Sequence, residues 1–582
     1  MYEEEQSLVG VEAWKERSLV DLLHFRRLTK GNNPIFLFLG DGENVTGQLS
    51  AEELHRQAGH AAAHLARTLD QGSHVILLFE NGLDYIVAFF ACLYAGHTPV
   101  SGIYPSSIGA RERFLFILQD SQAQAVLGKK ETLQLFHPDG ARSHPVKWIP
   151  LESALHAPRA LDPVATTPDS LALVQYTSGS TEEPKGVCLS HRNICHNIHT
   201  QLISFQYQDD DTGLSWLPFT HDMGLVGAVL PALAAGNPFY FMAPDKFIER
   251  PSRWLDAISR YGATISGGPD FAYRYCARLP GQETSTQWDL SRWKIAFNGS
   301  ENINPETLES FYGRFRHCGF GKEAFYACYG LAENALLVTS GVKGEGVRLV
   351  SFERVALSEG RAVATQTENS ERTISLSSCG APHEGQHVYI VDPETLAFLD
   401  EGLVGEIWID SPSVSVGYLK NPLRNALSFV EIDGIRYLRT QDFGFIHQGD
   451  LFHVGRLSEK FIHDGITFYT NDIALSLSQS LDGALCLVVP PSLPERDLPT
   501  LIIECEGAPD ERHLRGVLYE TMKRLRITRF AYHAIRKGYV IRTPSGKLRA
   551  DLTLNNILAE KSAILFSGDT QAPITTGASM II

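Results

Sequence analysis

The sequence predicts an α/β protein: a large N-terminal α/β domain with a strand-rich, barrel-like subdomain, followed by a small α+β domain. Three observations lead to this prediction. Over residues 18–127, short apolar runs alternate with helical stretches, which is typical of parallel βαβ units. From about residue 340 the pattern changes to short β-type runs separated by Gly and Pro. With 582 residues, the chain is also too long for one hydrophobic core, so two or more domains are expected.

The N-terminal part is expected to alternate helices with strands. A capping box of Ser50 and Glu53 opens the second helix, and Gly96 closes the third. The expected helices are 18–28, 50–69, 83–95 and 111–120, and the expected strands are 34–39, 74–79, 98–100 and 124–127. Because strands and helices alternate, the strands are expected to run parallel.

The stretch YTSGSTEEPKG at 176–186 follows an apolar run, 171–176, that is expected to be a buried strand. Its Gly and Ser residues let successive backbone N–H groups turn toward one point, which suits an anion. The hydroxyl donors and the compact charge of Lys185 suit phosphate. The stretch is not a Walker A loop, because the lysine precedes its glycine. A Ser/Thr-rich surface turn is the alternative, and the strand before the loop and the lysine after it favour phosphate.

Further short strands are expected to present small and polar residues at their carboxyl ends. These strands are expected at 214–217, 263–266, 294–297 and 324–329. The first is followed by PFTHDMGL (218–225), the third by NGSE (298–301) and the fourth by GLAE (330–333). Open α/β sheets bind ligands at the carboxyl ends of their strands, so these segments predict a ligand site.

Composition and charge exclude several classes of protein. A net charge of −16 argues against general nucleic-acid binding, which needs clustered positive charge. The acidic N-terminus has no apolar core, which predicts that there is no signal peptide. The most apolar stretch, 225–243, contains two prolines, so no membrane span is expected. Nine scattered cysteines without CxxC pairs indicate reduced thiols in the cytoplasm and no cysteine-based metal site.

Together, these motifs resemble those of the acyl-adenylate-forming enzymes, which include acyl-CoA synthetases, luciferases and peptide-synthetase adenylation domains. The resemblance covers about residues 18–551. It rests on the phosphate loop (176–186), YGLAE (329–333), RTQD (439–442), GR (455–456) and PSGK (544–547). HDMG (221–224), FAY (271–273) after SGGPD, NGSE and the segment after Glu333 are most similar to the fatty acyl-AMP ligases.

This resemblance implies ATP-dependent activation of a fatty acid to acyl-AMP, with release of pyrophosphate. The acyl group then passes to the phosphopantetheine thiol of an acyl carrier protein. Taken singly, Glu333 would be a helix-start carboxylate, Tyr329 a core aromatic and His221 a structural histidine. The implied catalytic residues are Lys547, His221 and Glu333, with Glu333 also the Mg²⁺ ligand. The implied nucleotide-binding residues are Thr177, Ser178, Gly179, Ser180, Thr181, Lys185, Gly299, Ser300, Glu301, Tyr329, Gly330, Leu331, Asp442 and Arg456.

The resemblance also implies the domain boundaries. These are an N-terminal adenylate-forming domain (1–456), a hinge (457–460), a mobile C-terminal domain (461–565) and a flexible tail (566–582). Between Glu333 and Gly380 lie 46 residues, of which 342–377 form an inserted segment. In fatty acyl-AMP ligases an insertion at this place is associated with failure to use free CoA.

Several positions depart from the family pattern. Gln441 stands where the ribose motif usually has Gly, and Thr220 where these ligases commonly have a second His. The hinge region departs at Glu459 and Lys460, and the segment after it departs at Thr470 and Ala474. Two alternatives therefore stay open. One is an acyl-CoA or aryl-CoA ligase on the same fold, and the other is a non-catalytic adenylate-binding or scaffold protein.

Overall fold

The computed structural model describes residues 17–105, 108–136, 146–177, 184–279, 288–367, 372–463, 466–481, 483–491, 496–542 and 548–569. The chain forms two compact units. Unit 1 comprises Met1–Arg348, Ser378–Val388 and Trp408–Arg439, and unit 2 comprises Leu349–Ser377, Tyr389–Ile407 and Thr440–Ile582. Three strands, β18 (His387–Val391), β19 (Gly405–Asp410) and β22 (Ile435–His447), therefore belong partly to each unit.

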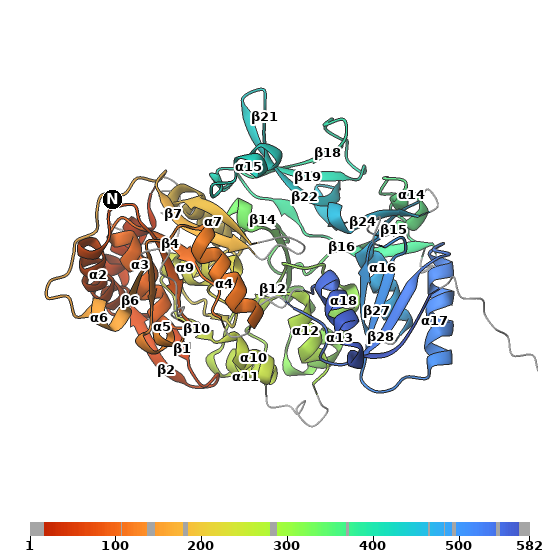
Figure 1. Ribbon diagram of the computed structural model, residues 1–582, viewed down its shortest axis with the longest axis horizontal. Coiled ribbons are helices and arrows are strands. Elements are labelled where there is room, and N and C mark those ends of the chain that lie inside the picture. The colour runs from red at the N-terminus through yellow and green to blue at the C-terminus, as the bar shows by residue number, and fades with distance from the viewer. Residues whose placement is uncertain are drawn as a thin grey trace, which may run out of the picture. The chain divides into compact units, whose positions relative to one another are not determined.

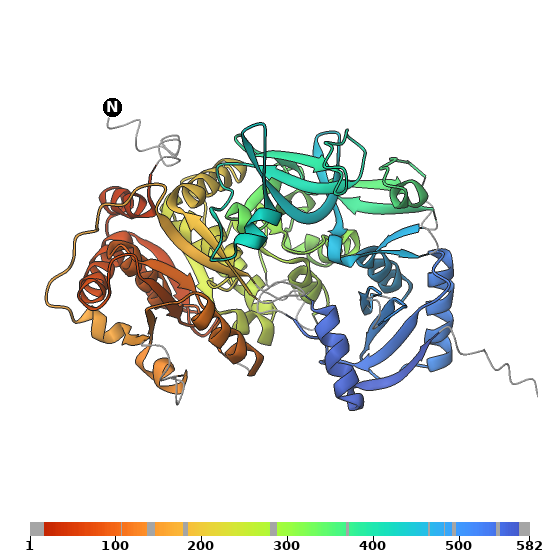
Figure 2. The same cartoon turned by 45° about the horizontal axis from the view of Figure 1, so that its top comes forward.

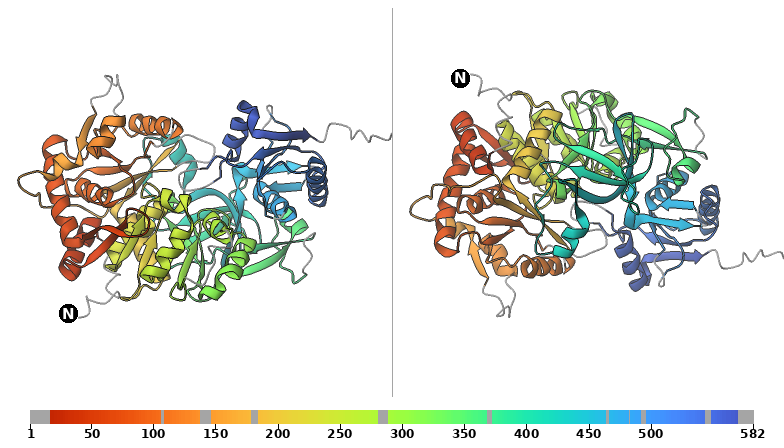
Figure 3. Two further views of the ribbon diagram at one scale, coloured as in Figure 1. Left: turned by 90° about the horizontal axis from the view of Figure 1, so that it is seen from below. Right: turned by 90° about the horizontal axis from the view of Figure 1, so that it is seen from above.

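The first sheet of unit 1 has seven strands in the order β20-β8-β7-β4-β3-β5-β6. Helices cover both faces, because alternate residues of β3 point to opposite sides. Val75 and Leu77 share a core with α3, while Ile76 and Leu78 pack in a second core with α4. Helices α2 and α3 pack against each other (Figures 1 and 3). The strands are β3 (His74–Leu78), β4 (Thr98–Ser101), β5 (Ala125–Gly128), β6 (Lys147–Pro150), β7 (Leu171–Thr177), β8 (Lys185–Ser190) and β20 (Gly417–Tyr418). The helices are α2 (Ala51–Thr68), α3 (Leu83–Tyr94), α4 (Ile108–Asp120), α5 (Lys130–Phe136) and α6 (Leu151–Leu155).

The second sheet of unit 1 has nine strands in the order β17-β14-β13-β12-β11-β9-β10-β1-β2. Strands β13, β12, β11, β9 and β10 run parallel, so their carboxyl ends lie at one edge of the sheet. The strands are β1 (Pro34–Leu39), β2 (Val45–Ser50), β9 (Gly213–Ser215), β10 (Phe239–Met242), β11 (Ile265–Gly268), β12 (Ile295–Asn298), β13 (Phe325–Gly330), β14 (Leu337–Ser340) and β17 (Ala381–Pro382). The accompanying helices include α1 (Leu19–Lys30), α7 (His191–Ser204), α9 (Leu230–Ala235), α10 (Pro244–Glu249), α11 (Ser252–Tyr261), α12 (Asp270–Ala277) and α13 (Pro305–Phe315).

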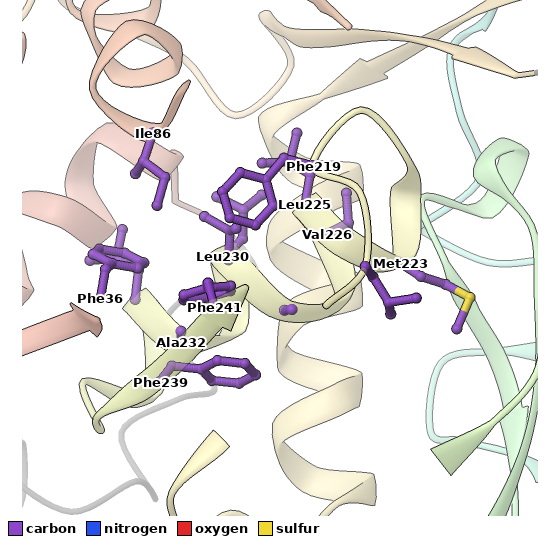
Figure 4. Packing of buried hydrophobic residues seen from close by; sticks show 14 of the residues in the cluster. Phe36, Ile86, Phe219, Met223, Leu225, Val226, Leu230, Ala232, Phe239 and Phe241 are labelled. Carbon is purple, nitrogen blue, oxygen red and sulfur yellow. The ribbon is translucent and has the colours of Figure 1, made fainter. Parts of the chain in front are cut away.

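An aromatic cluster lies beside the parallel strands of this sheet. Phe241 packs edge-on against Phe219, with ring centroids 5.3 Å apart, and stacks on Phe239 at 4.8 Å. Figure 4 shows these rings together with Leu230, whereas Met223 points away from them. Because Phe219 is buried in this core, the loop that follows β9 is anchored two residues before His221.

Helix caps account for the start of α7 and correct the expected start of α2. Ser190 caps α7, accepting a hydrogen bond from Asn193 N. The predicted capping box at Ser50 is wrong in part. Ser50 accepts from Glu53 N, but the Glu53 carboxylate accepts from Arg56 and Gln57 instead of returning to the Ser50 backbone. A lone i, i+3 sequence match does not exclude these competing partners one turn further on.

Unit 2 contains most of the inserted segment. Its strands β15 (Leu349–Glu353) and β16 (Thr373–Ser377) form a hairpin, with α14 (Arg354–Ser358) following β15. The unit 2 part of β22 pairs with β23 (Asp450–Arg456). Phe352 and Ile374 of the hairpin share a core with Phe443, Phe445 and Phe452 of these two strands. The inserted segment therefore packs on the strand-rich part of the chain.

The C-terminal part of unit 2 is a four-stranded sheet in the order β26-β27-β28-β29 with helices on both faces. Cys486 and Val488 pack with α16 and α17, while Leu487 and Val489 pack with α18. Figure 2 shows α17 running alongside this sheet. The elements are η8 (Leu457–Glu459), β24 (Lys460–His463), β25 (Ile466–Tyr469), α16 (Thr470–Ser480), β26 (Leu485–Val489), β27 (Thr500–Cys505), α17 (Glu511–Arg524), β28 (Ala531–Arg536), α18 (Ala550–Ala559) and β29 (Ile564–Asp569).

The flexible tail was predicted to begin at residue 566, but the last strand extends beyond that residue. Strand β29 continues to Asp569, because its residues pair with β28. The rest of the predicted tail, 570–582, lies outside the described residues. Within the described ranges, no helix is long and apolar enough to cross a membrane.

Candidate active site

The predicted phosphate loop connects the antiparallel strands β7 and β8. Thr177 lies opposite Lys185 at the open end of this hairpin. Tyr176 is fixed by two contacts: its N–H donates to Ser101 Oγ at 2.8 Å, and its hydroxyl donates to Asp120 Oδ2 at 2.5 Å. The loop is thus anchored at its base. Four of the predicted phosphate-binding residues lie outside the described residues, namely Ser178, Gly179, Ser180 and Thr181.

Two glycines at the edge of the nine-stranded sheet permit a close approach of backbone segments. A Cβ on Gly299, which follows β12, would lie 2.7 Å from the carbonyl oxygen of Cys328. A Cβ on Gly330, at the end of β13, would lie 2.1 Å from the carbonyl oxygen of Leu336. Both distances exclude any side chain. The predicted nucleotide segments after β12 and β13 therefore run close to neighbouring backbone.

The segment after β12 carries polar atoms that lack a partner among the described residues. Asn298 Oδ1 and Ser300 Oγ are buried and receive no hydrogen bond there. Ser300 also has a φ of 75°, a left-handed conformation that is uncommon for serine. Glu301 has a partner in the protein, because its Oε1 accepts from Phe271 N at 2.6 Å. Unsatisfied buried polar atoms are costly, so Asn298 and Ser300 mark a place for a polar ligand.

Asp270, at the start of α12, holds both ends of this segment. Its carboxylate accepts from Asn298 Nδ2 at 3.2 Å, from Asn304 N at 3.1 Å and from Thr307 Oγ1 at 2.8 Å. Burial, together with the nearby charge of Glu301, raises the pKa of Asp270 from 3.8 to about 7. Asp270 was not among the predicted site residues. Its signal in the sequence was its place at the end of SGGPD, after a short strand, which does not show which loop it would contact.

Glu333 lies in the short helix η7 (Ala332–Asn334), just beyond β13. Its Oε1 accepts a hydrogen bond from the Tyr418 hydroxyl at 2.8 Å. Its carbonyl oxygen accepts from Ser415 N at 2.8 Å. Burial and the adjacent Glu333 raise the pKa of Tyr418, so the hydroxyl keeps its proton and acts as the donor. Tyr329, two residues before Leu331, is buried at the end of β13.

His221 stands at the N-terminus of the short helix α8 (Asp222–Gly224). Its Nδ1 lies 2.7 Å from Asp222 Oδ1 and 3.3 Å from Met223 N. Nδ1 is therefore engaged locally, and Nε2 is the ring nitrogen left for a ligand. A Cβ on Gly224 would lie 1.9 Å from the carbonyl oxygen of Pro218, so this tight turn requires glycine.

Two amide side chains hold the loop that carries His221. Asn81 donates to Leu217 O at 2.8 Å and accepts from Phe219 N at 2.9 Å. Gln175, on β7 beside the phosphate loop, donates to Thr220 O at 2.7 Å. Neither residue was among the predicted site residues, since neither belongs to a recognisable motif.

Two of these hydrogen bonds join the two sheets of unit 1. Gln175 links β7 to the His221 loop after β9, and Tyr418 links β20 to Glu333 after β13. We call the β7–β8 pair with its connecting loop the phosphate hairpin. The structure therefore brings the base of the phosphate hairpin, the His221 loop and Glu333 into one region. These segments were predicted from separate stretches of sequence.

Unit 2 contains the predicted ribose residues. Asp442 lies opposite Arg456 in the β22–β23 ladder, and Arg456 Nε is 3.2 Å from Asp442 Oδ1. Asp442 N donates to Thr440 Oγ1 at 3.0 Å, which holds the turn in place. Gln441 has a φ of 63°, and its N–H donates to buried Glu406 at 3.2 Å. The left-handed backbone explains why glycine suits this position, and the exposed Gln441 side chain keeps that backbone at a cost of about 1 kcal/mol.

Lys547 and the rest of PSGK (544–547) lie outside the described residues. The predicted hinge, 457–460, spans the single helical turn η8 and the first residue of β24. Its role as a hinge, like the proposed domain boundaries, stays a prediction.

The described residues contain no group of three or more His, Cys, Asp or Glu side chains that could hold a metal. This does not conflict with Mg²⁺, which is commonly bound through one or two carboxylates together with substrate phosphates. Glu333 suits that arrangement, because it is a carboxylate held at one oxygen by Tyr418.

The fold is that of the acyl-adenylate-forming enzymes, as comparisons with known proteins show. The AMP-binding enzyme family matches residues 29–419. The medium-chain-fatty-acid–[acyl-carrier-protein] ligase JamA of Moorena producens is 36% identical over 483 residues, covering 80% of this chain and 80% of that protein. The long-chain-fatty-acid–AMP ligase FadD32 of Mycolicibacterium smegmatis is 32% identical over 501 residues, covering 80% and 78%.

A solved structure also matches over most of the chain. It is the fatty acyl-adenylate ligase of L. pneumophila in complex with acyl adenylate and pyrophosphate, at 32% identity and a TM-score of 0.73. The match covers 95% of this chain and 98% of that one. The chain therefore belongs to the AMP-binding enzyme family and, within it, to the fatty acyl-AMP ligases. This confirms the predicted family and fold class.

Proposed function

We propose that this protein activates a fatty acid with ATP to form acyl-AMP and then transfers the acyl group to an acyl carrier protein. The observation that carries the proposal is the meeting of the phosphate hairpin and Glu333 through Tyr418. Relatives similar in sequence are named as fatty acid–carrier-protein ligases and fatty acid–AMP ligases. Their names support a fatty acid as the substrate and a carrier protein as the acceptor.

In the first step, a carboxylate oxygen of the fatty acid attacks the α-phosphorus of ATP. The bond to the β-phosphate breaks, and pyrophosphate leaves with its electron pair. Both reactants are anionic, so catalysis depends on charge neutralisation and positioning. Lys185 and the hairpin N–H groups would bind the leaving phosphates. Lys547, assigned by its motif, would stabilise the charge at the α-phosphate and the attacking carboxylate.

The nucleotide is assigned to the polar atoms around β12 and β13. Asn298 Oδ1 can accept from the exocyclic amino group of adenine, and Ser300 Oγ can donate to a ring nitrogen or accept from that group. Tyr329 offers a ring face beside them. For the ribose we assign Asp442, whose carboxylate can accept from both hydroxyls while Arg456 holds one of its oxygens. Mg²⁺ bound by Glu333 would neutralise charge on the ATP phosphates.

In the second step, the phosphopantetheine thiol attacks the acyl carbonyl, and AMP leaves as the thioester forms. Carrier proteins are typically acidic, so a basic surface favours their encounter. Residues 511–542 of unit 2 supply exposed cations for such a surface, two of which, Arg529 and Lys537, pair with Asp497 and Glu506. Its exposed cations are Arg512, Lys523, Arg524, Arg526, Arg529, Arg536 and Lys537. Arg549, seven residues further along the chain than Arg542, is buried and does not contribute. We also assign the protein to the cytoplasm, because ATP is used there and the nine free thiols stay reduced there.

The test is ATP–pyrophosphate exchange with a panel of acids from short to long chains, including aryl and amino acids. We expect exchange that depends on fatty acids and is weak with the others. A protein that binds ATP but shows no carboxylate-dependent exchange would contradict the proposal and favour the non-catalytic alternative. Comparing free CoA with a phosphopantetheinylated carrier as acceptor then distinguishes a carrier-directed ligase from a CoA ligase.

A further inference from the structure

Tyr418 contacts both the phosphate hairpin and the carboxylate assigned to the cation. Its backbone lies opposite Val187 of β8 in the sheet. The next residue, Leu419, donates from its N–H to Gly186 O at 2.8 Å. The Tyr418 hydroxyl donates to Glu333 Oε1, also at 2.8 Å. A displacement of β8 would therefore be transmitted to the Glu333 carboxylate through a single residue.

The position of Tyr418 is itself well determined. Asn425, in α15 (Pro422–Ser428), accepts from Tyr418 N at 2.7 Å and donates to Tyr418 O at 3.0 Å. Arg436 donates to the carbonyl oxygen of Ser415 at 2.9 Å, and Ser415 N–H donates to Glu333 O. Tyr418 is buried, with 8% of the residue exposed, so water competes little for its hydroxyl.

We propose that Tyr418 is a positioning residue for the divalent cation that accompanies ATP, orienting the Glu333 carboxylate and coupling that orientation to the phosphate hairpin. This inference rests on the proposed function. A hydroxyl that holds one carboxylate oxygen restricts rotation of the group and directs the other oxygen to the cation. Partners of this kind typically contribute tenfold to a hundredfold to metal affinity. Glu333 receives no other hydrogen bond to its carboxylate from the described residues, so the effect of Tyr418 is not duplicated there.

The direct test is Tyr418→Phe, which keeps the ring and removes the donor. We expect the Mg²⁺ concentration that half-saturates pyrophosphate exchange to rise about tenfold or more, with the loss recovered by added Mg²⁺. A second measurement needs no turnover. Mn²⁺ binding in the presence of a non-hydrolysable ATP analogue, followed by electron paramagnetic resonance, should weaken by a similar factor. Asn425→Ala, which releases the Tyr418 backbone, should shift Mn²⁺ binding in the same direction.

Tyr326→Phe is the matched control. Tyr326 is also buried, at 1% exposure, and its hydroxyl donates to Ser204 O at 2.9 Å. Removing that hydroxyl should lower thermal stability and leave Mn²⁺ affinity unchanged. In a Glu333→Gln background, adding Tyr418→Phe should cause no further loss of Mn²⁺ affinity, because both changes act on one ligand.

The proposal would be overturned if Tyr418→Phe bound Mn²⁺ as tightly as the native protein or as Tyr326→Phe. It would also be overturned if the Tyr418 and Glu333 changes reduced Mn²⁺ affinity additively. In either case, fatty-acid-dependent exchange by the native enzyme would leave the proposed function standing. Absence of that exchange in the native enzyme would instead remove the proposed function itself.

Discussion

An ion pair joins the inserted segment to α16 in unit 2, and it can be removed selectively. Arg354 Nη1 lies 2.7 Å from Asp472 Oδ1 in α16, with side-chain exposures of 17% and 29%. Arg354 also donates to Thr373 O at 2.9 Å. We predict that this pair restrains the inserted segment and thereby limits the use of free CoA.

The expected coupling energy between Arg354 and Asp472 follows from the burial of the pair. Fully exposed pairs contribute about 0.2–1 kcal/mol, and hydrogen bonds to charged groups contribute about 1.5–3 kcal/mol. A partly buried pair at 2.7 Å should therefore give a coupling energy of about 1 kcal/mol between Arg354→Ala and Asp472→Ala. One kcal/mol corresponds to about a fivefold change in an equilibrium.

Hydrogen exchange of the amides in 349–377 measures this local stability directly. Asp472→Ala should speed their exchange about fivefold, and Arg354→Ala should do so at least as much because it also loses the hydrogen bond to Thr373 O. The double variant should add little to Arg354→Ala. The same variants should raise the rate with free CoA while pyrophosphate exchange stays near the native rate. Arg361→Ala is the control, because Arg361 pairs only with exposed Glu359 on the same segment among the pairs the structure shows. Strict additivity of the two changes, or CoA rates equal to those of Arg361→Ala, would refute the prediction.

Three further predictions concern charge. Lys547→Ala should lower acyl-AMP formation by orders of magnitude while thioester formation from supplied acyl-AMP survives better; near-native pyrophosphate exchange would show that the assignment is wrong. Reversing three exposed arginines to Glu should slow transfer to the carrier, most at low salt, without changing adenylation, and equal transfer rates at all salt concentrations would exclude docking there. Those arginines are Arg524, Arg526 and Arg529. Because the pKa of Asp270 is raised from 3.8 to about 7, its carboxylate should cost stability progressively as pH rises from about 4 to 7. Asp270→Asn should remove that decline in thermal unfolding curves measured from pH 4 to 8, and parallel curves for the two proteins would contradict this.

Much of unit 1 could be predicted from sequence because its signals are local. The run at 171–176 and the four later strands were predicted within about two residues of their observed bounds, since each is short, apolar and ended by turn residues. Gly299 and Gly330 were predicted as site residues from their motifs. The structure adds the reason that glycine is needed there, which is the neighbouring backbone that leaves no room for a side chain. Gln441 was recognised as a departure, and the structure supplies the reason, a positive φ.

The sequence by itself therefore determined the residue types of the site, the strands that carry them and the family to which the chain belongs. Only the tertiary structure decided which of these segments meet. Tyr418 and Glu333 are 85 residues apart, and Gln175 and Thr220 are 45 residues apart. No local pattern encodes such a hydrogen bond, because its length and direction depend on how the seven-stranded and nine-stranded sheets pack together. The same holds for Asp270, whose partners and raised pKa come from burial that packing alone produces.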